Sequence, residues 1–108
     1  MEIERRKAPR ARVKLEARWE GVTSRDKATV TDLSRTGCFV LTGGNVEVKE
    51  LVWLEIELNE SQKVNFWAEV VSEAADIGFA LKFNSSSPED EAALAQFLEK
   101  IFQGQTKA

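Results

Sequence analysis

The sequence contains no histidine and a single cysteine, Cys38. Without histidine, imidazole general bases, Ser-His-Asp and Cys-His triads, and histidine-ligated zinc or haem are excluded. One cysteine excludes an intrachain disulfide and a metal site built from four thiolates. We therefore expect that the chain is not an enzyme and carries no cofactor. The single thiol also fits a reducing compartment.

Long hydrophobic runs are missing as well. No apolar stretch approaches the roughly 18 residues that a transmembrane helix needs. The charged N-terminus, residues 1–7, is not followed by the apolar stretch of a secretory signal. We therefore expect a cytoplasmic protein that does not insert into membranes.

The net charge of −3 is unevenly distributed along the chain. Residues 1–27 hold nine Lys/Arg and five Asp/Glu, a local charge of +4, whereas residues 28–108 hold six and thirteen, a local charge of −7. A cationic N-terminal region followed by an acidic remainder of the chain suggests a localised site for an anionic ligand. The alternative is a solvated N-terminal tail. The acidic body argues against nucleic acid as the partner, because general nucleic-acid binding favours a basic domain.

The 108 residues have room for a single domain. From Val13 onward, apolar and polar residues mostly alternate with the period of two that is typical of strands. Short polar turns separate strand-like segments spaced by roughly ten residues, which indicates a small barrel or sandwich. These segments are residues 13–19, 28–31, 38–41, 51–58, 64–71 and 77–83, with turns expected at 21–27, 59–62 and 72–76.

The three tryptophans, Trp19, Trp53 and Trp67, all fall in predicted strands. We expect them to pack in the core or at the rim of a barrel, and base stacking is the alternative. In the segment 51–58 the expected inward side chains include Leu51 and Trp53. Cys38 lies in an apolar strand, so we expect a buried thiol that does not react.

The period changes after the serine run at residues 85–87. Ser87 and Pro88 are suited to the N-cap and the first position of a helix. Five apolar residues then recur at helical spacing and give one apolar face: Leu94, Phe97, Leu98, Ile101 and Phe102. We predict a helix over about residues 88–103, ended by Gly104. Its apolar face would cover one barrel opening or one sheet face, and binding of a partner is the alternative.

Two short motifs carry the functional signal. Arg6 and Arg10 form an RxxxR in which Pro9 disfavours both a helix interior and a central strand. The sequence therefore predicts that this segment is an arm that leads into the first strand. Guanidinium groups on such an arm can bind phosphate or the Hoogsteen edge of guanine in bidentate fashion, or stack on a purine.

The second motif, DxSxxG, consists of Asp32, Ser34 and Gly37 between the second and third strands. An ionised Asp32 only accepts hydrogen bonds, which suits the N1–H and N2 amino edge of guanine. Gly37 permits a positive φ or a close backbone approach. The alternative is a polar turn in which Asp32 and Ser34 cap their own backbone.

Together, in this order, the two motifs resemble the PilZ family of bacterial cyclic di-GMP receptors, and the resemblance covers nearly the whole chain. It implies an all-β fold with one C-terminal helix, a six-stranded antiparallel β-barrel capped by the helix. It also implies a flexible cationic arm at residues 1–12 and a barrel with its helix at residues 13–104, within a single domain.

The resemblance further implies the site. Arg6 and Arg10 would hold guanine and phosphate, and the DxSxxG residues would hold a guanine edge. Arg5 would influence whether one cyclic di-GMP or an intercalated dimer binds, while Arg12 and Arg35 are candidate second contacts. The full set is Arg5, Arg6, Arg10, Arg12, Asp32, Ser34, Arg35 and Gly37.

The function implied is that of a cyclic di-GMP receptor or adaptor. Its arginine arm would become ordered on binding, and the signal would pass to a separate, unidentified protein. The alternative is a PilZ-like adaptor that acts through protein contacts and binds nucleotide weakly or not at all.

Overall fold

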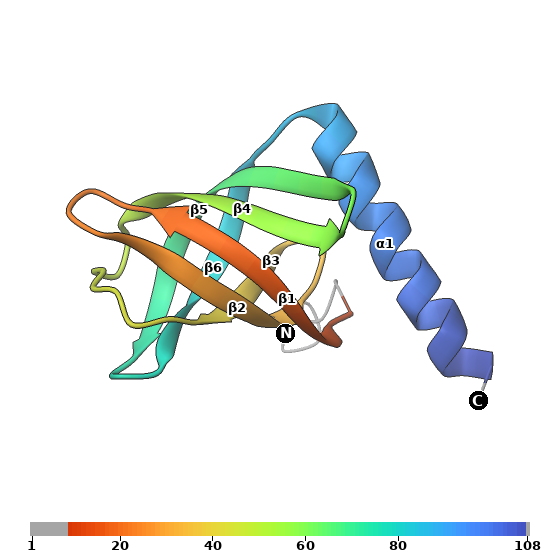
Figure 1. Ribbon diagram of the computed structural model, residues 1–108, viewed down its shortest axis with the longest axis horizontal. Helices are drawn as coiled ribbons and strands as arrows, with labels where there is room; N and C mark the ends of the chain where they lie inside the picture. The colour runs from red at the N-terminus through yellow and green to blue at the C-terminus, as the bar shows by residue number, and fades with distance from the viewer. Residues whose placement is uncertain (1–8, 108) are drawn as a thin grey trace, which may run out of the picture.

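A computed structural model describes residues 9–107, and the side chains of residues 9–104. Within this range the chain forms a closed barrel of six antiparallel strands followed by one helix (Figure 1). The strand order around the barrel is β1-β2-β3-β6-β5-β4, and β4 pairs with β1 to close it. The elements are β1 (Ala11–Glu20), β2 (Arg25–Leu33), β3 (Gly37–Leu41), β4 (Leu51–Asn59), β5 (Gln62–Ala74), β6 (Gly78–Ser85) and α1 (Pro88–Lys107). The expected fold class is confirmed.

Two strands extend into segments that the sequence pattern predicted as turns. β2 begins at Arg25, because residues 25–27 pair with the end of β1 even though they lack a β-type pattern. β5 continues to Ala74, and its last residues pair with the start of β6. The turn after β5 is correspondingly short, with Asp76 at a φ of 65°.

The barrel interior is filled by alternate residues of the strands. In β4 the buried side chains are Val52, Leu54, Ile56 and Leu58. The expectation that Leu51 and Trp53 point inward is wrong, since both are exposed on the outer wall. Strict alternation along β4 decides this, because side chains of neighbouring residues point to opposite faces.

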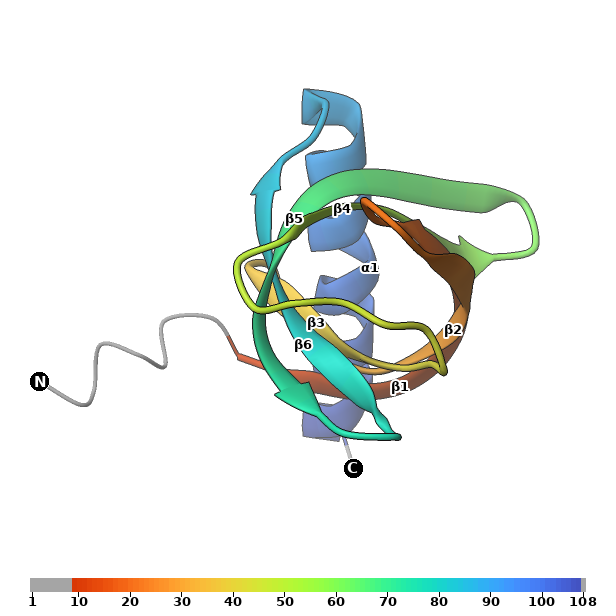
Figure 2. The same cartoon turned by 90° about the vertical axis from the view of Figure 1, so that its left-hand side faces the viewer.

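Helix α1 lies across one end of the barrel (Figures 1 and 2). Leu94 and Leu98 are buried there, and the other predicted apolar positions pack against the core more loosely. The N-cap is confirmed, since the Asp90 amide donates to Ser87 Oγ at 3.1 Å. Asp90 Oδ2 in turn accepts from the Asn65 amide of β5 at 2.9 Å and ties the helix to the barrel.

The predicted helix end at Gly104 is wrong, because α1 continues to Lys107. Glycine ends helices by adopting a positive φ, and none of the described glycines does so. A glycine that stays helical only weakens the last turn. Polar residues interrupt α1 too often for it to serve as a transmembrane segment, and it is the one helix among residues 9–107.

The opposite end of the barrel is filled by Trp19, which is buried as expected. Its indole meets the Phe79 ring edge-on at 5.1 Å, and its Nε1 donates to Thr42 Oγ1 at 3.0 Å. Gly44 is needed here, because a Cβ at this position would overlap the Trp19 ring. The barrel therefore has a helix end and a tryptophan end.

Candidate functional site

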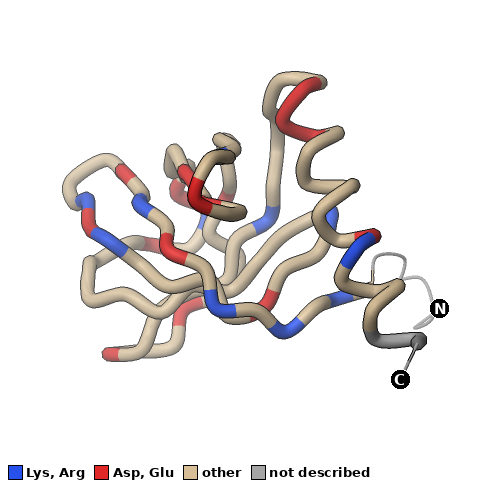
Figure 3. Tube along the Cα trace, turned by 45° about the vertical axis from the view of Figure 1, so that its right-hand side comes forward, with Lys and Arg blue, Asp and Glu red and all other residues tan. Residues whose placement is uncertain are grey.

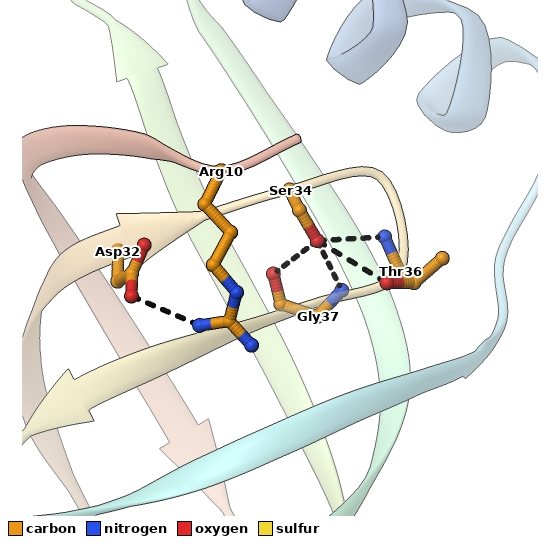
Figure 4. A network of polar contacts seen from close by, with 5 residues as sticks. All are labelled: Arg10, Asp32, Ser34, Thr36 and Gly37. Carbon is orange, nitrogen blue, oxygen red and sulfur yellow. Dashed lines mark hydrogen bonds and ion pairs between the residues drawn. The ribbon is translucent and has the colours of Figure 1, made fainter. Parts of the chain in front are cut away.

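The two sequence motifs meet at the helix end of the barrel. β1 and β2 pair in a register that places Ala11 opposite Leu33 and Arg12 opposite Asp32. Leu33 and Ala11 point into the core, as expected for Leu33, and Arg12 is exposed on the outer face. The antiparallel ladder thus brings Arg10, at the entry to β1, beside Asp32, at the end of β2 (Figure 4).

Arg10 and Asp32 form an ion pair. Arg10 Nη1 donates to Asp32 Oδ2 at 2.9 Å, and the side chains are 64% and 34% exposed. An ion pair this accessible to water contributes less than about 1 kcal/mol to folding. Its geometry is therefore not fixed by the fold, and both side chains can exchange this contact for contacts to a ligand.

Ser34 is buried, and its hydroxyl is turned into its own loop (Figure 4). Ser34 Oγ accepts from the amides of Thr36 at 3.1 Å and Gly37 at 3.2 Å, and it lies 3.2 Å from Thr36 Oγ1. The Ser34 amide donates to the Gly37 carbonyl at 2.9 Å, which closes the turn. The turn-capping alternative therefore describes Ser34 in this structure, whereas Asp32 points its carboxylate outward to Arg10.

Gly37 is required by a close backbone approach and not by a positive φ. A Cβ at this position would overlap the Leu81 carbonyl oxygen of β6. Gly37 pairs with Lys82 in the β3–β6 ladder, and the Phe83 amide donates to the Thr36 carbonyl at 2.8 Å. The motif loop is thus fixed against β6 on its inner side, while its outer side faces solvent.

A cleft of about 400 Å³ lies between this loop and the first turns of α1. Pro9 of the arm and Arg35 of the loop both line it. Phe66 and Phe83 form its apolar floor, with their rings stacked at 4.2 Å. Sequence reasoning missed this cleft, whose remaining lining residues are Thr36, Asn84, Ser85, Glu91 and Leu94. Only the pairing of β3 with β6 places these residues beside the motif.

The site is cationic in its immediate surroundings. Arg12, two residues beyond Arg10, and Arg35 of the motif loop are both exposed, and basic positions recur along β1 toward its start (Figure 3). Asp32 is an anion among them, and Glu91 of the acidic first turn of α1 also lines the cleft. Arg5 and Arg6 lie outside the described residues. Within residues 9–107, no group of three or more metal-ligating side chains is arranged to hold an ion.

Cys38 lies directly behind the site, opposite Leu33 in the β2–β3 ladder, and it is buried as expected. Burial raises the pKa of the Cys38 thiol far above its ordinary value. The Asp32 carboxylate raises this pKa further, and the Arg10 guanidinium opposes the rise. The thiol therefore stays protonated and unreactive in the folded chain.

Replacing Ser34 with alanine should lower the free energy of unfolding by about 1–3 kcal/mol, because the two part-buried hydrogen bonds from the amides of Thr36 and Gly37 to Ser34 Oγ are lost. Urea denaturation measures this loss. Ser72→Ala, at an exposed position of β5, is the matched control and should change stability by less than about 0.5 kcal/mol. Equal stability of the two variants would contradict the turn-capping role.

The Cys38 environment predicts a dependence of stability on pH. Above the ordinary thiol pKa of 9.0, the unfolded chain loses a proton that the folded chain keeps. The contribution of Cys38 is therefore intact below pH 9 and declines above it, by about 1.4 kcal/mol per pH unit. Urea denaturation on either side of pH 9 should show a steeper decline for the wild type than for Cys38→Ala. Parallel declines would show that the thiol ionises in the folded state.

Several known proteins share this architecture. The Bacillus subtilis inhibitor of motility MotI/DgrA has a TM-score of 0.76 at 18% identity, over 95% of this chain and 52% of that one. Escherichia coli YcgR in complex with cyclic di-GMP has a TM-score of 0.77 at 17% identity, over 95% and 48%. The separate PilZ domain of YcgR with cyclic di-GMP has a TM-score of 0.76 at 14% identity, over 95% of both chains.

At these identities the likeness concerns the fold, and this chain spans about half the length of MotI/DgrA and of YcgR. No curated protein sequence matches the chain. The family model of the PilZ domain, in contrast, matches residues 4–100, which include both motifs, all six strands and most of α1. The sequence, the barrel and this match lead to one conclusion: the chain belongs to the PilZ domain family.

Proposed function

We propose that this PilZ domain is a receptor for cyclic di-GMP that signals to a separate protein. The observation that carries the proposal is the contact between Arg10 and Asp32, since it unites the two motifs at one solvent-exposed point. The solved PilZ domain of YcgR, which has the same fold, holds cyclic di-GMP. The chemistry of the ligand then suggests a role for each side chain.

Cyclic di-GMP offers two phosphates and two guanines. The Asp32 carboxylate only accepts hydrogen bonds, so it is suited to the N1–H and N2 amino edge of one guanine. Arg10 has five N–H donors, which suit a phosphate or the Hoogsteen edge of a guanine. On binding, both residues would exchange their mutual contact for the ligand. The free energy lost is small, because the ion pair is exposed.

Ser34 and Gly37 act differently in this proposal. Their contacts within the loop and against β6 hold the backbone that presents Asp32. Ser34 is therefore a positioning residue, and its replacement would weaken ligand binding through a distorted loop. Arg35, at the mouth of the cleft lined by Pro9 and Phe83, is a second cation for the phosphates or a stacking partner for a guanine.

The arm supplies the signalling step. Arg5 and Arg6 precede Pro9, which lines the same cleft as Arg35. A ligand held by Asp32 would bring phosphates within reach of these arginines and order the arm around itself. The ordered arm and ligand would form a new surface at the helix end of the barrel for a downstream protein to recognise.

Isothermal titration calorimetry with cyclic di-GMP tests the proposal, with cyclic di-AMP and GTP as control ligands. We expect saturable binding of cyclic di-GMP alone. Arg10→Ala and Arg6→Ala should each weaken it by about 1.5–3 kcal/mol, because charge-assisted hydrogen bonds are lost. Asp32→Asn should weaken it by about 1–3 kcal/mol.

Arg18→Ala provides the matched control, because Arg18 is an exposed arginine of the same strand at the other end of the barrel. It should bind like the wild type. Absence of binding heat at high ligand concentration, or equal losses for Arg10→Ala and Arg18→Ala, would contradict the receptor function. The first result would favour an adaptor that acts through protein contacts alone.

A further inference from the structure

The cleft beside the motif loop continues the candidate ligand site. Pro9, which lines the cleft, directly precedes Arg10 in the chain. Arg35, which also lines it, follows Asp32 by three residues, a span of at most about 11 Å. The cleft therefore begins beside the contact between Arg10 and Asp32, and a ligand bound there can extend into it. Its volume of about 400 Å³ is typical of sites for small molecules.

The floor of the cleft suits a flat aromatic group. The rings of Phe66 and Phe83 stack at 4.2 Å, with an angle of 17° between their planes. Phe83 is only half-buried, so part of its side chain remains open to the cleft, and Leu94 adds an aliphatic wall on the side of α1. Aromatic side chains bind nucleobases through their π faces, whichever base is present. The floor therefore accommodates a base without selecting one.

Two charged residues line the cleft, Arg35 of the motif loop and Glu91 of α1. Both are exposed, and within residues 9–107 neither side chain has a hydrogen bond or an ion pair. Because the cleft lies between these two elements, a ligand in it would meet a cation on one side and a carboxylate on the other. A neutral base with polar edges matches this arrangement, whereas a phosphate would be repelled by Glu91.

The surroundings of Glu91 leave its carboxylate available as an acceptor. The residues one turn away on α1 are uncharged: Ser87, Pro88, Leu94 and Ala95. Asp90 is also acidic, and its carboxylate is already occupied by the Asn65 amide. Lys82, the cation of β6, is on the opposite face of that strand from Phe83. Glu91 is therefore suited to a group that donates hydrogen bonds.

We propose that the cleft binds the second guanine of cyclic di-GMP and that Glu91 accepts hydrogen bonds from its N1–H and N2 amino groups. The proposal rests on the function proposed above. The two guanines extend from opposite sides of the sugar–phosphate ring, so a molecule held by Asp32 through one guanine presents the other to the cleft. The base would lie on Phe83, and Arg35 would face a phosphate at the mouth of the cleft.

Glu91 would then determine the specificity for guanine at this second position. A carboxylate only accepts hydrogen bonds, and guanine has two adjacent donors in N1–H and the N2 amino group. Adenine has an acceptor, N1, where guanine has N1–H, so the lone pair of adenine N1 would face the carboxylate. Because Glu91 belongs to α1, the ligand would also connect the helix to the two sequence motifs.

Calorimetric titration of the full chain with cyclic di-GMP tests the role of Glu91. Glu91→Gln should weaken binding about tenfold, because the amide group replaces one acceptor with a donor. Glu89→Gln is the matched control, since Glu89 is exposed in the same acidic first turn and does not line the cleft. This control should bind as tightly as the wild type or slightly more tightly, because it removes the same negative charge from a protein that binds an anion.

The hybrid ligand cyclic GMP-AMP, which has one guanine and one adenine, tests the specificity. The wild type should bind it more weakly than cyclic di-GMP in either orientation, because both carboxylates require the donors of guanine. A glutamine amide can pair with adenine, since it offers a donor and an acceptor together. The ratio of the two dissociation constants should therefore fall about tenfold in Glu91→Gln and stay unchanged in Glu89→Gln. A general effect on the helix would not change this ratio.

NMR spectroscopy locates the second guanine. On saturation of the wild type with cyclic di-GMP, the amide signals of Glu91 and Leu94 should shift. The indole signals of Trp53 and Trp67 provide the reference and should not change. These two rings meet edge-to-face at 5.0 Å on the outer wall of the barrel, a position that the sequence pattern did not predict, and they do not line the cleft.

The proposal is overturned if cyclic di-GMP binds but Glu91→Gln and Glu89→Gln bind it equally well. It is also overturned if the ratio of dissociation constants in Glu91→Gln remains that of the wild type, or if the Glu91 and Leu94 amide signals do not shift. Each of these results would leave the receptor function intact. Absence of binding to the wild type would instead contradict the receptor function, and this proposal with it.

Discussion

The antiparallel pairing of β1 with β2 fixes the arginine motif relative to the aspartate motif. The register that pairs Ala11 with Leu33 places Arg10 and Asp32 in contact just outside the barrel. The same strand pairs with β4 and closes the barrel. Site and fold therefore depend on one ladder, and a shift of one residue would send Asp32 toward the core and separate the motifs.

Within the DxSxxG motif the residues divide into two roles. Ser34 and Gly37 have their contacts inside the protein, with the loop amides and against the β6 backbone. Asp32 has an exposed ion pair that a ligand can replace at little cost. This division explains how a loop can be rigid enough to hold a carboxylate in position and still offer an exchangeable contact.

Alternation and helical spacing were sufficient for a barrel or sandwich followed by one helix with an apolar face, because these patterns report burial directly. The choice of a closed barrel and the partnership of the two motifs came from the resemblance to the PilZ family. The pattern failed where every residue of a segment is apolar, as in Leu51–Leu54, since such a run does not say which face Trp53 occupies. It also failed for polar strand residues such as Arg25, whose structure depends on a partner strand. The cleft beside Arg35 could not be predicted either, because it requires the pairing of β3 with β6, which are distant in sequence.

The central claim is that one ligand joins the cationic arm to the DxSxxG loop. Hydrogen–deuterium exchange of residues 5–12, measured with and without saturating cyclic di-GMP, tests it most directly. The account predicts that amides of this segment exchange much more slowly in the presence of the ligand, while those around Trp53 and Trp67 are unchanged. Equal exchange of residues 5–12 in both conditions would contradict it.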